Sequence, residues 1–148
     1  MLLAGAARSW GHSPSIIDLD AAPMNREELS RSIADAMPAF IVFVVYGQNP
    51  NAGTTSMIGA TKTASELKKD IPEAQICFIG SHASALPFDV ISLPYVDFAF
   101  INEGVVGLKV LLQTNFKDNL EKVPGLWFKS SDGQRWTGFV RQRAGKDN

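Results

Sequence analysis

Apolar and polar positions form alternating blocks along this chain, some typical of strands and others typical of helices. Residues 39–46 (AFIVFVVY) are apolar throughout, as in a strand covered on both faces of a sheet. Residues 25–37 place their apolar side chains at helical spacing instead. Asn25 and Glu28 stand where a capping box would start that helix. The two patterns indicate a protein built from both strands and helices.

The other blocks continue this alternation. They predict helices over 1–10, 57–69, 88–93 and 105–112, strands over 15–20, 75–79 and 96–101, and a β-hairpin over 126–136. The hairpin is indicated by Asp132-Gly133, a strong turn signal between apolar and aromatic runs. Strands that alternate with helices imply right-handed crossovers. We therefore predict an α/β fold, a mostly parallel sheet of about four strands with flanking helices plus a C-terminal β-hairpin.

Three predicted loops deserve functional interest because ligands bind beyond the carboxyl ends of parallel strands. They span residues 47–56, 80–85 and 102–104. The first exceeds the usual strand-to-helix connection of about 2 to 6 residues. It is polar, and it leads to a helix start that Thr54, Thr55 or Ser56 would cap, where backbone N–H groups and hydroxyls suit a phosphate or an amide. An ordinary long surface loop explains the same pattern equally well.

The charged and histidine side chains near these loops have two interpretations each. His82 follows a tight turn at a strand end, close to any ligand over the sheet, although a turn or capping role is more common for such a histidine. Glu103 can accept hydrogen bonds from a ligand or cap the next helix, and we favour the cap. We expect a structural role for His12. Asp18 and Asp20 end a predicted strand and form no defensible pair of catalytic carboxylates.

Composition narrows the classes of function. The 148 residues suffice for one domain. A formal net charge of −1 does not indicate the basic surface that binding to nucleic acid or to an anionic membrane requires. The basic residues near the C-terminus read as a solvated tail: Arg135, Arg141, Arg143 and Lys146. The longest apolar run is too short to span a bilayer, and no secretory signal is visible, so a cytoplasmic location is expected.

Cys77 is the single cysteine. It lies in the middle of a predicted buried strand, where cysteine behaves as a small apolar residue. One cysteine excludes an internal disulfide, and no cluster of cysteine and histidine has the spacing of a zinc or iron–sulfur site. No catalytic constellation and no metal ligand is therefore predicted.

Four short segments occur in an order that resembles the order found in a known protein family. They are GH followed by IID at 11–18, GSHASALP at 80–87, VDFAFINEG at 96–104 and VPGLW at 123–127. Together they resemble the N-terminal cobalamin-binding domain of cobalamin-dependent (class B) radical SAM enzymes, over nearly the whole chain. The resemblance implies a Rossmann-like, flavodoxin-like sheet that holds a corrinoid across its strand ends. The cofactor contacts that it implies come from Tyr46, Gly47, Asn49, Thr54, Thr55, Ser56, Gly80, Ser81, His82, Ala83, Ser84, Glu103 and Gly104.

The chain also departs from that family. It has no Asp-x-His-x-x-Gly motif, so no histidine is assigned to cobalt. It lacks the Cys-x-x-x-Cys-x-x-Cys motif of the catalytic domain, so neither a [4Fe–4S] cluster nor S-adenosylmethionine is expected to bind. The resemblance implies that the family's first strand is missing ahead of residues 1–122, the cobalamin-binding-like domain. Residues 123–148 then form a hairpin and a linker that would lead into a missing radical SAM domain.

The sequence therefore predicts a cobalamin-binding module that is non-catalytic alone and works with a radical SAM domain in cis or in trans. Two alternatives stay open: a flavodoxin-like domain for a flavin or a nucleotide, and a remnant without a ligand. A phospho-acceptor receiver domain fits poorly, because the strand over 39–46 ends in Tyr46 and not in an aspartate. The substrate and reaction of a parent enzyme cannot be read from these residues.

Overall fold

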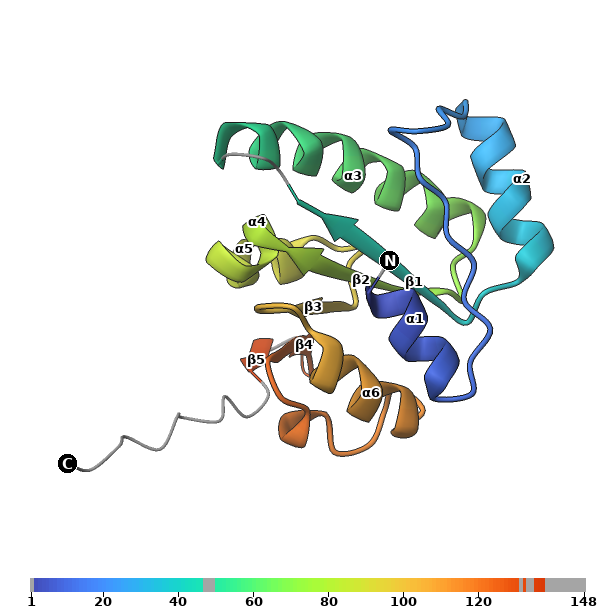
Figure 1. Cartoon of the computed structure of the whole chain (residues 1–148). Helices are drawn as coiled ribbons and strands as arrows, with labels where there is room; N and C mark the ends of the chain where they lie inside the picture. The colour runs from blue at the N-terminus through green and yellow to red at the C-terminus, as the bar shows by residue number, and fades with distance from the viewer. Residues whose placement is uncertain (1, 47–49, 131, 133–134, 138–148) are drawn as a thin grey trace.

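A five-stranded sheet with helices on both faces forms the protein (Figure 1). The computed structural model describes residues 2–46, 50–130, 132 and 135–137. The strand order is β1-β2-β3-β4-β5, and the strands are β1 (Phe40–Val45), β2 (Gln75–Gly80), β3 (Phe98–Phe100), β4 (Leu126–Lys129) and β5 (Arg135–Thr137). The first three are parallel, and β4 and β5 add an antiparallel pair. The predicted α/β fold with a C-terminal hairpin is confirmed.

The helices form two layers around the sheet. One face carries α3 (Pro50–Asp70), α4 (Ser81–Ala85) and α5 (Pro87–Ser92), and the other carries α1 (Leu2–Ser9) and α6 (Val105–Gln113) (Figure 1). A short 3-10 helix, η1 (Leu120–Lys122), precedes β4. The central strand β2 is buried on both sides: Ile76 and Phe78 pack under α3 to α5, and Cys77 and Ile79 pack toward α6. This two-sided burial anchors the strand ends described below.

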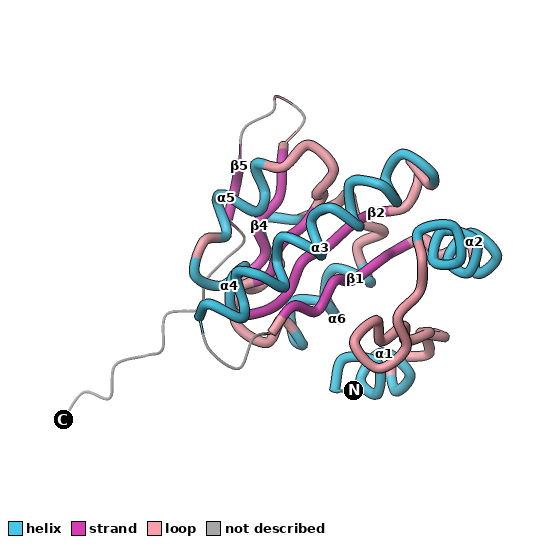
Figure 2. The backbone as a smooth tube through the Cα atoms, turned by 90° about the horizontal axis from the view of Figure 1, so that it is seen from above, coloured by secondary structure: helices cyan, strands magenta, loops and turns pink. Residues whose placement is uncertain are grey.

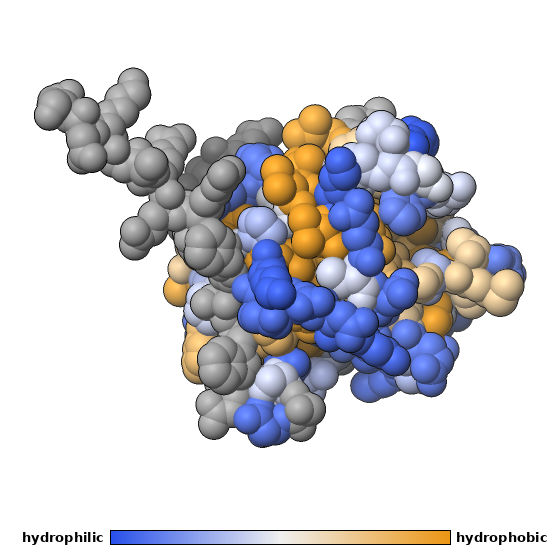
Figure 3. Space-filling model, turned by 90° about the horizontal axis from the view of Figure 1, so that it is seen from below, coloured by the Kyte–Doolittle hydropathy of each residue, from blue (hydrophilic) through white to orange (hydrophobic). Residues whose placement is uncertain are grey.

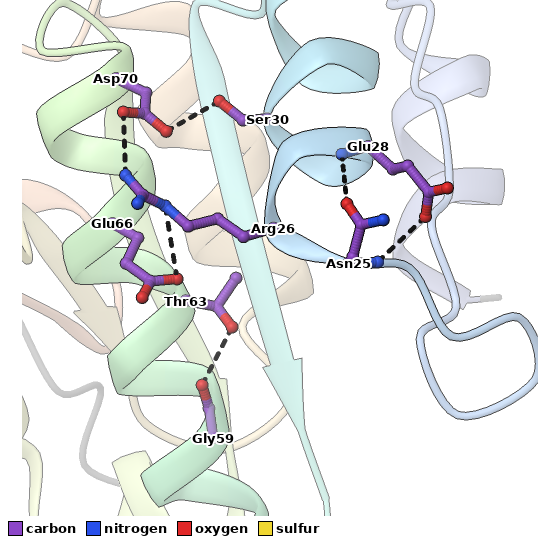
Figure 4. A network of polar contacts seen from close by, with 8 residues as sticks. All are labelled: Asn25, Arg26, Glu28, Ser30, Gly59, Thr63, Glu66 and Asp70. Atoms are coloured by element: carbon purple, nitrogen blue, oxygen red, sulfur yellow. Dashed lines mark hydrogen bonds and ion pairs between the residues drawn. The ribbon is translucent and has the colours of Figure 1, made fainter.

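Helix α2 (Arg26–Ala36) packs on α3 through apolar and polar contacts. Its predicted capping box is present, with Glu28 N–H donating to Asn25 Oδ1 at 2.9 Å and Asn25 N–H donating to Glu28 Oε2 at 3.0 Å (Figure 4). Ser30 Oγ donates to Asp70 at 2.8 Å, and Arg26 lies 3.4 Å from the same carboxylate (Figure 4). These contacts fix α2 beside the C-terminal half of α3.

The prediction of a strand over residues 15–20 is wrong. That segment is irregular, and Asp18 forms a turn in which its side chain accepts from the N–H groups of Asp20 and Ala21. The connection from α1 to α2 passes from one face of the sheet to the other beside β1 (Figures 1 and 2). Within the described residues β1 pairs with β2 alone, so no strand stands next to its outer edge. A strand pattern without a pairing partner has no ladder to join.

The expectation that residues 39–46 are covered on both faces is met only in part: Phe40 and Val42 pack toward the α6 side, and Ile41 and Phe43 pack toward α2 and α3. β1 is an edge strand of intermediate burial, and Val44 and Tyr46 are 52% and 49% exposed. The apolar run is nevertheless a strand, as predicted, because β-branched and aromatic side chains suit a pleated, half-buried surface. In the part of the chain described here, no helix is long and apolar enough to cross a membrane.

Candidate functional site

The carboxyl ends of β1, β2 and β3 meet at one edge of the sheet, at Val45, Gly80 and Phe100. Helices α3, α4 and α6 begin at the same edge (Figure 1). Parallel strands followed by helices place backbone N–H groups and loop side chains together there. This edge is therefore the candidate site, and it gathers residues that lie far apart in the sequence.

Gly80 makes the tight transition from β2 to α4. It is the last residue of β2, pairs with Val45 of β1, and is followed at once by the helix. Its φ of 145° is open to glycine alone, and a Cβ there would lie 1.9 Å from the carbonyl oxygen of Val45. The prediction of a loop over residues 80–85 is wrong, since residues 81–85 are helical. Glycine is required at this position by the neighbouring strand, whatever a ligand requires.

Helix α4 presents small residues next to this turn. Ser81 is exposed, His82 is half-buried and Ala83 is buried. The Oγ atom of Ser84 accepts a hydrogen bond from the Asn102 N–H at 2.8 Å. That bond joins α4 to the connection between β3 and α6, so two of the predicted site segments are held together.

Tyr46 and Glu103 meet across the same edge. The Tyr46 hydroxyl donates to Glu103 Oε2 at 3.2 Å, although the residues are 57 positions apart. Glu103 does not cap α6, contrary to the interpretation favoured from the sequence, because the N-cap Gly104 has no side-chain hydrogen bond and Glu103 reaches Tyr46 instead. Partial burial, and then the charge and hydrogen bond of Glu103, raise the pKa of Tyr46. The phenol therefore keeps its proton and acts as a donor at neutral pH.

The residues expected in the loop over 47–56 divide into two groups. Gly47 and Asn49 lie outside the described residues. Helix α3 begins at Pro50, so Thr54, Thr55 and Ser56 belong to the helix and do not precede it. The long loop and its hydroxyl cap were therefore wrong predictions from residue 50 onward. Pro at the first helical position is favourable because its missing N–H would have no partner there.

The remaining candidate residues have structural surroundings. The backbone N–H of His12 donates to the Ala7 carbonyl at 3.1 Å, at the end of α1. Cys77 is fully buried in β2, and this burial, followed by the charge of Asp97, raises the pKa of its thiol well above the usual range. Among the described residues, no three His, Cys, Asp or Glu side chains are grouped to hold a metal ion.

Hollows and apolar patches occur away from the strand ends as well. Two hollows of about 420 and 250 Å³ lie between α2 and α3, lined by the ion pairs of Arg26, Glu66 and Asp70 and their neighbours. The surface on the α6 side carries an apolar strip bordered by hydrophilic residues (Figure 3). Two large apolar side chains, Leu86 and Phe88, are 47% and 50% exposed at the junction of α4 and α5.

Solved structures with the same fold come from cobalamin-dependent radical enzymes. The radical S-adenosylmethionine methyltransferase TsrM from Kitasatospora setae, with cobalamin and a [4Fe–4S] cluster bound, matches with a TM-score of 0.78 and 16% identity, over 99% of this chain and 27% of TsrM. The cobalamin-dependent S-adenosylmethionine radical enzyme OxsB, with aqua-cobalamin and S-adenosylmethionine bound, matches with a TM-score of 0.68 and 15% identity, over 95% of this chain and 19% of OxsB.

These similarities show the fold. At that level they confirm the resemblance that the sequence predicts. The chain spans only about a quarter or a fifth of the length of these enzymes. Comparisons with protein-family models and with curated proteins find no match.

Proposed function

We propose that this chain is a cobalamin-binding module that is non-catalytic alone and acts with a radical SAM domain in cis or in trans. The observation that carries the proposal is the fold shared over 99% and 95% of the chain with two enzymes that bind cobalamin. The resemblance of the segments at 80–87, 96–104 and 123–127 supports it independently, because it rests on residue types and order.

The residues at the strand ends fit an amide-rich corrinoid. Ser81 is small and exposed, which suits the close approach of a large flat ring, whereas Ala83 is buried in the core beneath it. The exposed Tyr46 phenol and the Glu103 carboxylate supply a polar surface over the end of β2. Ser84 holds the β3–α6 connection in place. When bound, a corrinoid supplies a cobalt that can carry an alkyl group.

This chain's own residues bind and orient the cofactor. We expect no protein imidazole on cobalt, because His82 is not part of an Asp-x-His-x-x-Gly motif. We also expect no iron–sulfur cluster on this chain, because Cys77 is its only cysteine. A partner domain would have to supply that chemistry.

The test is a titration of the chain with hydroxocobalamin, followed by absorption and by equilibrium dialysis, with flavin mononucleotide and ATP run in parallel. We expect saturable binding of the corrinoid alone, with a Kd below about 100 μM. Ser81→Trp should weaken binding at least about tenfold by filling the space over α4. Gln113→Trp, at the far end of α6, is the matched control and should leave the Kd unchanged.

Two results would overturn the proposal. Absence of corrinoid binding at about 100 μM would refute the module, and binding of the flavin or ATP alone would replace it with the nucleotide alternative. The spectrum of bound hydroxocobalamin also reports the axial ligand. An imidazole-ligated spectrum that disappears in His82→Ala would contradict the expected absence of a protein ligand on cobalt.

A further inference from the structure

The Glu103 carboxylate is fixed at the mouth of the candidate site. It follows β3, and its hydrogen bond from Tyr46 crosses the carboxyl end of β2, which lies between β1 and β3 in the sheet. The local alternative, a cap for α6, is not used. The position of this carboxylate is thus set by a contact across the sheet, and its charge is directed to the strand ends.

The segments that form this edge contain no permanently charged cation near Glu103, and their one basic side chain is the imidazole of His82. Residues 46, 80–85 and 102–104 contain neither lysine nor arginine, and Glu103 is their only acid. A carboxylate accepts about four hydrogen bonds, and Tyr46 supplies one. Within the described residues the other acceptor positions of Glu103 have no partner, so a ligand with N–H donors can use them.

We infer that Glu103 makes this site selective for corrinoids whose peripheral groups are amides and rejects corrinoids whose peripheral groups are carboxylates. The inference rests on the proposed function. An amide N–H donating to a carboxylate forms a charge-assisted hydrogen bond, which is about twice as strong as a neutral one. A ligand carboxylate at the same place would bring two negative charges together without a cation between them, which is strongly unfavourable.

The experiment compares two probes, dicyanocobinamide and dicyanocobyrinic acid. Both lack the nucleotide base, and the first carries amides where the second carries carboxylates. We expect the chain to bind cobinamide at least about tenfold more tightly at low salt, and the preference to shrink as salt rises. Glu103→Gln should remove most of the preference by strengthening the binding of cobyrinic acid. Tyr46→Phe should reduce the preference in part, because the carboxylate loses the donor that fixes it.

Glu73→Gln is the matched control. Glu73 is exposed just before β2, at the amino ends of the strands and away from the candidate site. The same change in net charge there should leave the preference intact. Equal affinity of the unmodified chain for both probes would overturn this inference alone. An equal loss of both affinities in Glu103→Gln would also overturn it, since that is the signature of a structural role. Failure of both probes to bind would also overturn this inference, and failure of hydroxocobalamin as well would overturn the proposed function itself.

Discussion

Gly80 sets the geometry of the strand ends through its lack of a side chain. The carbonyl oxygen of Val45 occupies the space that a Cβ would need, and the φ of 145° is unfavourable for any other residue. A bulky residue at this position would disturb β1 before it met a ligand. Binding experiments with Gly80 variants would therefore confuse misfolding with loss of contact, and exposed residues such as Ser81 are better probes of the site.

We predict that Gly80→Ala destabilises the fold by about 3 kcal/mol or more, because β1 must move away from the new methyl group and the backbone remains strained. Urea unfolding followed by circular dichroism measures the change. Gly59→Ala is the matched control: Gly59 lies in α3 with no atom within 4 Å of its added Cβ. That variant should be more stable by up to about 1 kcal/mol. Similar stability of the two variants would contradict the close approach of β1 to Gly80.

Single residues were predictable from the sequence where their partners are close along the chain. The Asn25–Glu28 box joins residues three positions apart, and it is present. The contact of Glu103 with Tyr46 spans 57 positions, so the sequence offered only the local alternative, a helix cap. Side-chain roles that depend on the sheet topology need the topology first.

Elements show the same distinction between local and distant causes. Most helices were predicted because an apolar stripe at helical spacing is a property of the segment itself. The segment at 15–20 has a good strand pattern, yet it is irregular because no neighbouring backbone pairs with it among the described residues. The hairpin was predicted, whereas its antiparallel pairing with β3 was not, since the pairing partner is distant in sequence.

Asp97 joins the carboxyl end of α3 to the amino ends of β2 and β3. One oxygen of its carboxylate accepts from Lys68 Nζ at 2.8 Å and from the backbone N–H of Ile76 at 2.8 Å. Lys68 also donates to the Ala74 carbonyl. The Asp97 side chain, just before β3, therefore links α3 and β2 at the amino ends of the parallel strands, opposite the candidate site.

We predict that Asp97→Ala destabilises the protein by about 2 to 3 kcal/mol, because the N–H of the fully buried Ile76 and the ammonium of Lys68 both lose an acceptor. Asp97→Asn should be affected less, since its amide oxygen can still accept from Ile76. Chemical unfolding of the three proteins measures the difference. Equal stability of Asp97→Ala and the unmodified chain would show that this junction contributes nothing to the fold.

On the scale of the whole molecule, the outer side of β1, the side that faces away from β2, is the least complete part of the sheet. Six apolar residues, 40–45, pair on one side with β2, and the described residues place no strand on the other. Such an edge exposes backbone donors and acceptors and invites association with other chains. The irregular segment beside it leaves Ile16 and Ile17 51% and 37% exposed. The interior around β2 is well packed, so stability is distributed unevenly across the sheet.

We therefore predict marginal stability, with a cooperative thermal transition below about 65 °C, within the usual range for mesophilic domains. Hydrogen exchange should locate the weakness: amides of β1 should exchange faster than those of β2, because β1 is held from one side and its side chains are half-buried, whereas β2 is paired on both sides and buried. Calorimetry at several protein concentrations separates unfolding of the chain from association of chains through the outer side of β1. A transition well above about 65 °C, or equal protection of β1 and β2, would show that the outer edge of β1 is covered and that the sheet is complete without a further strand.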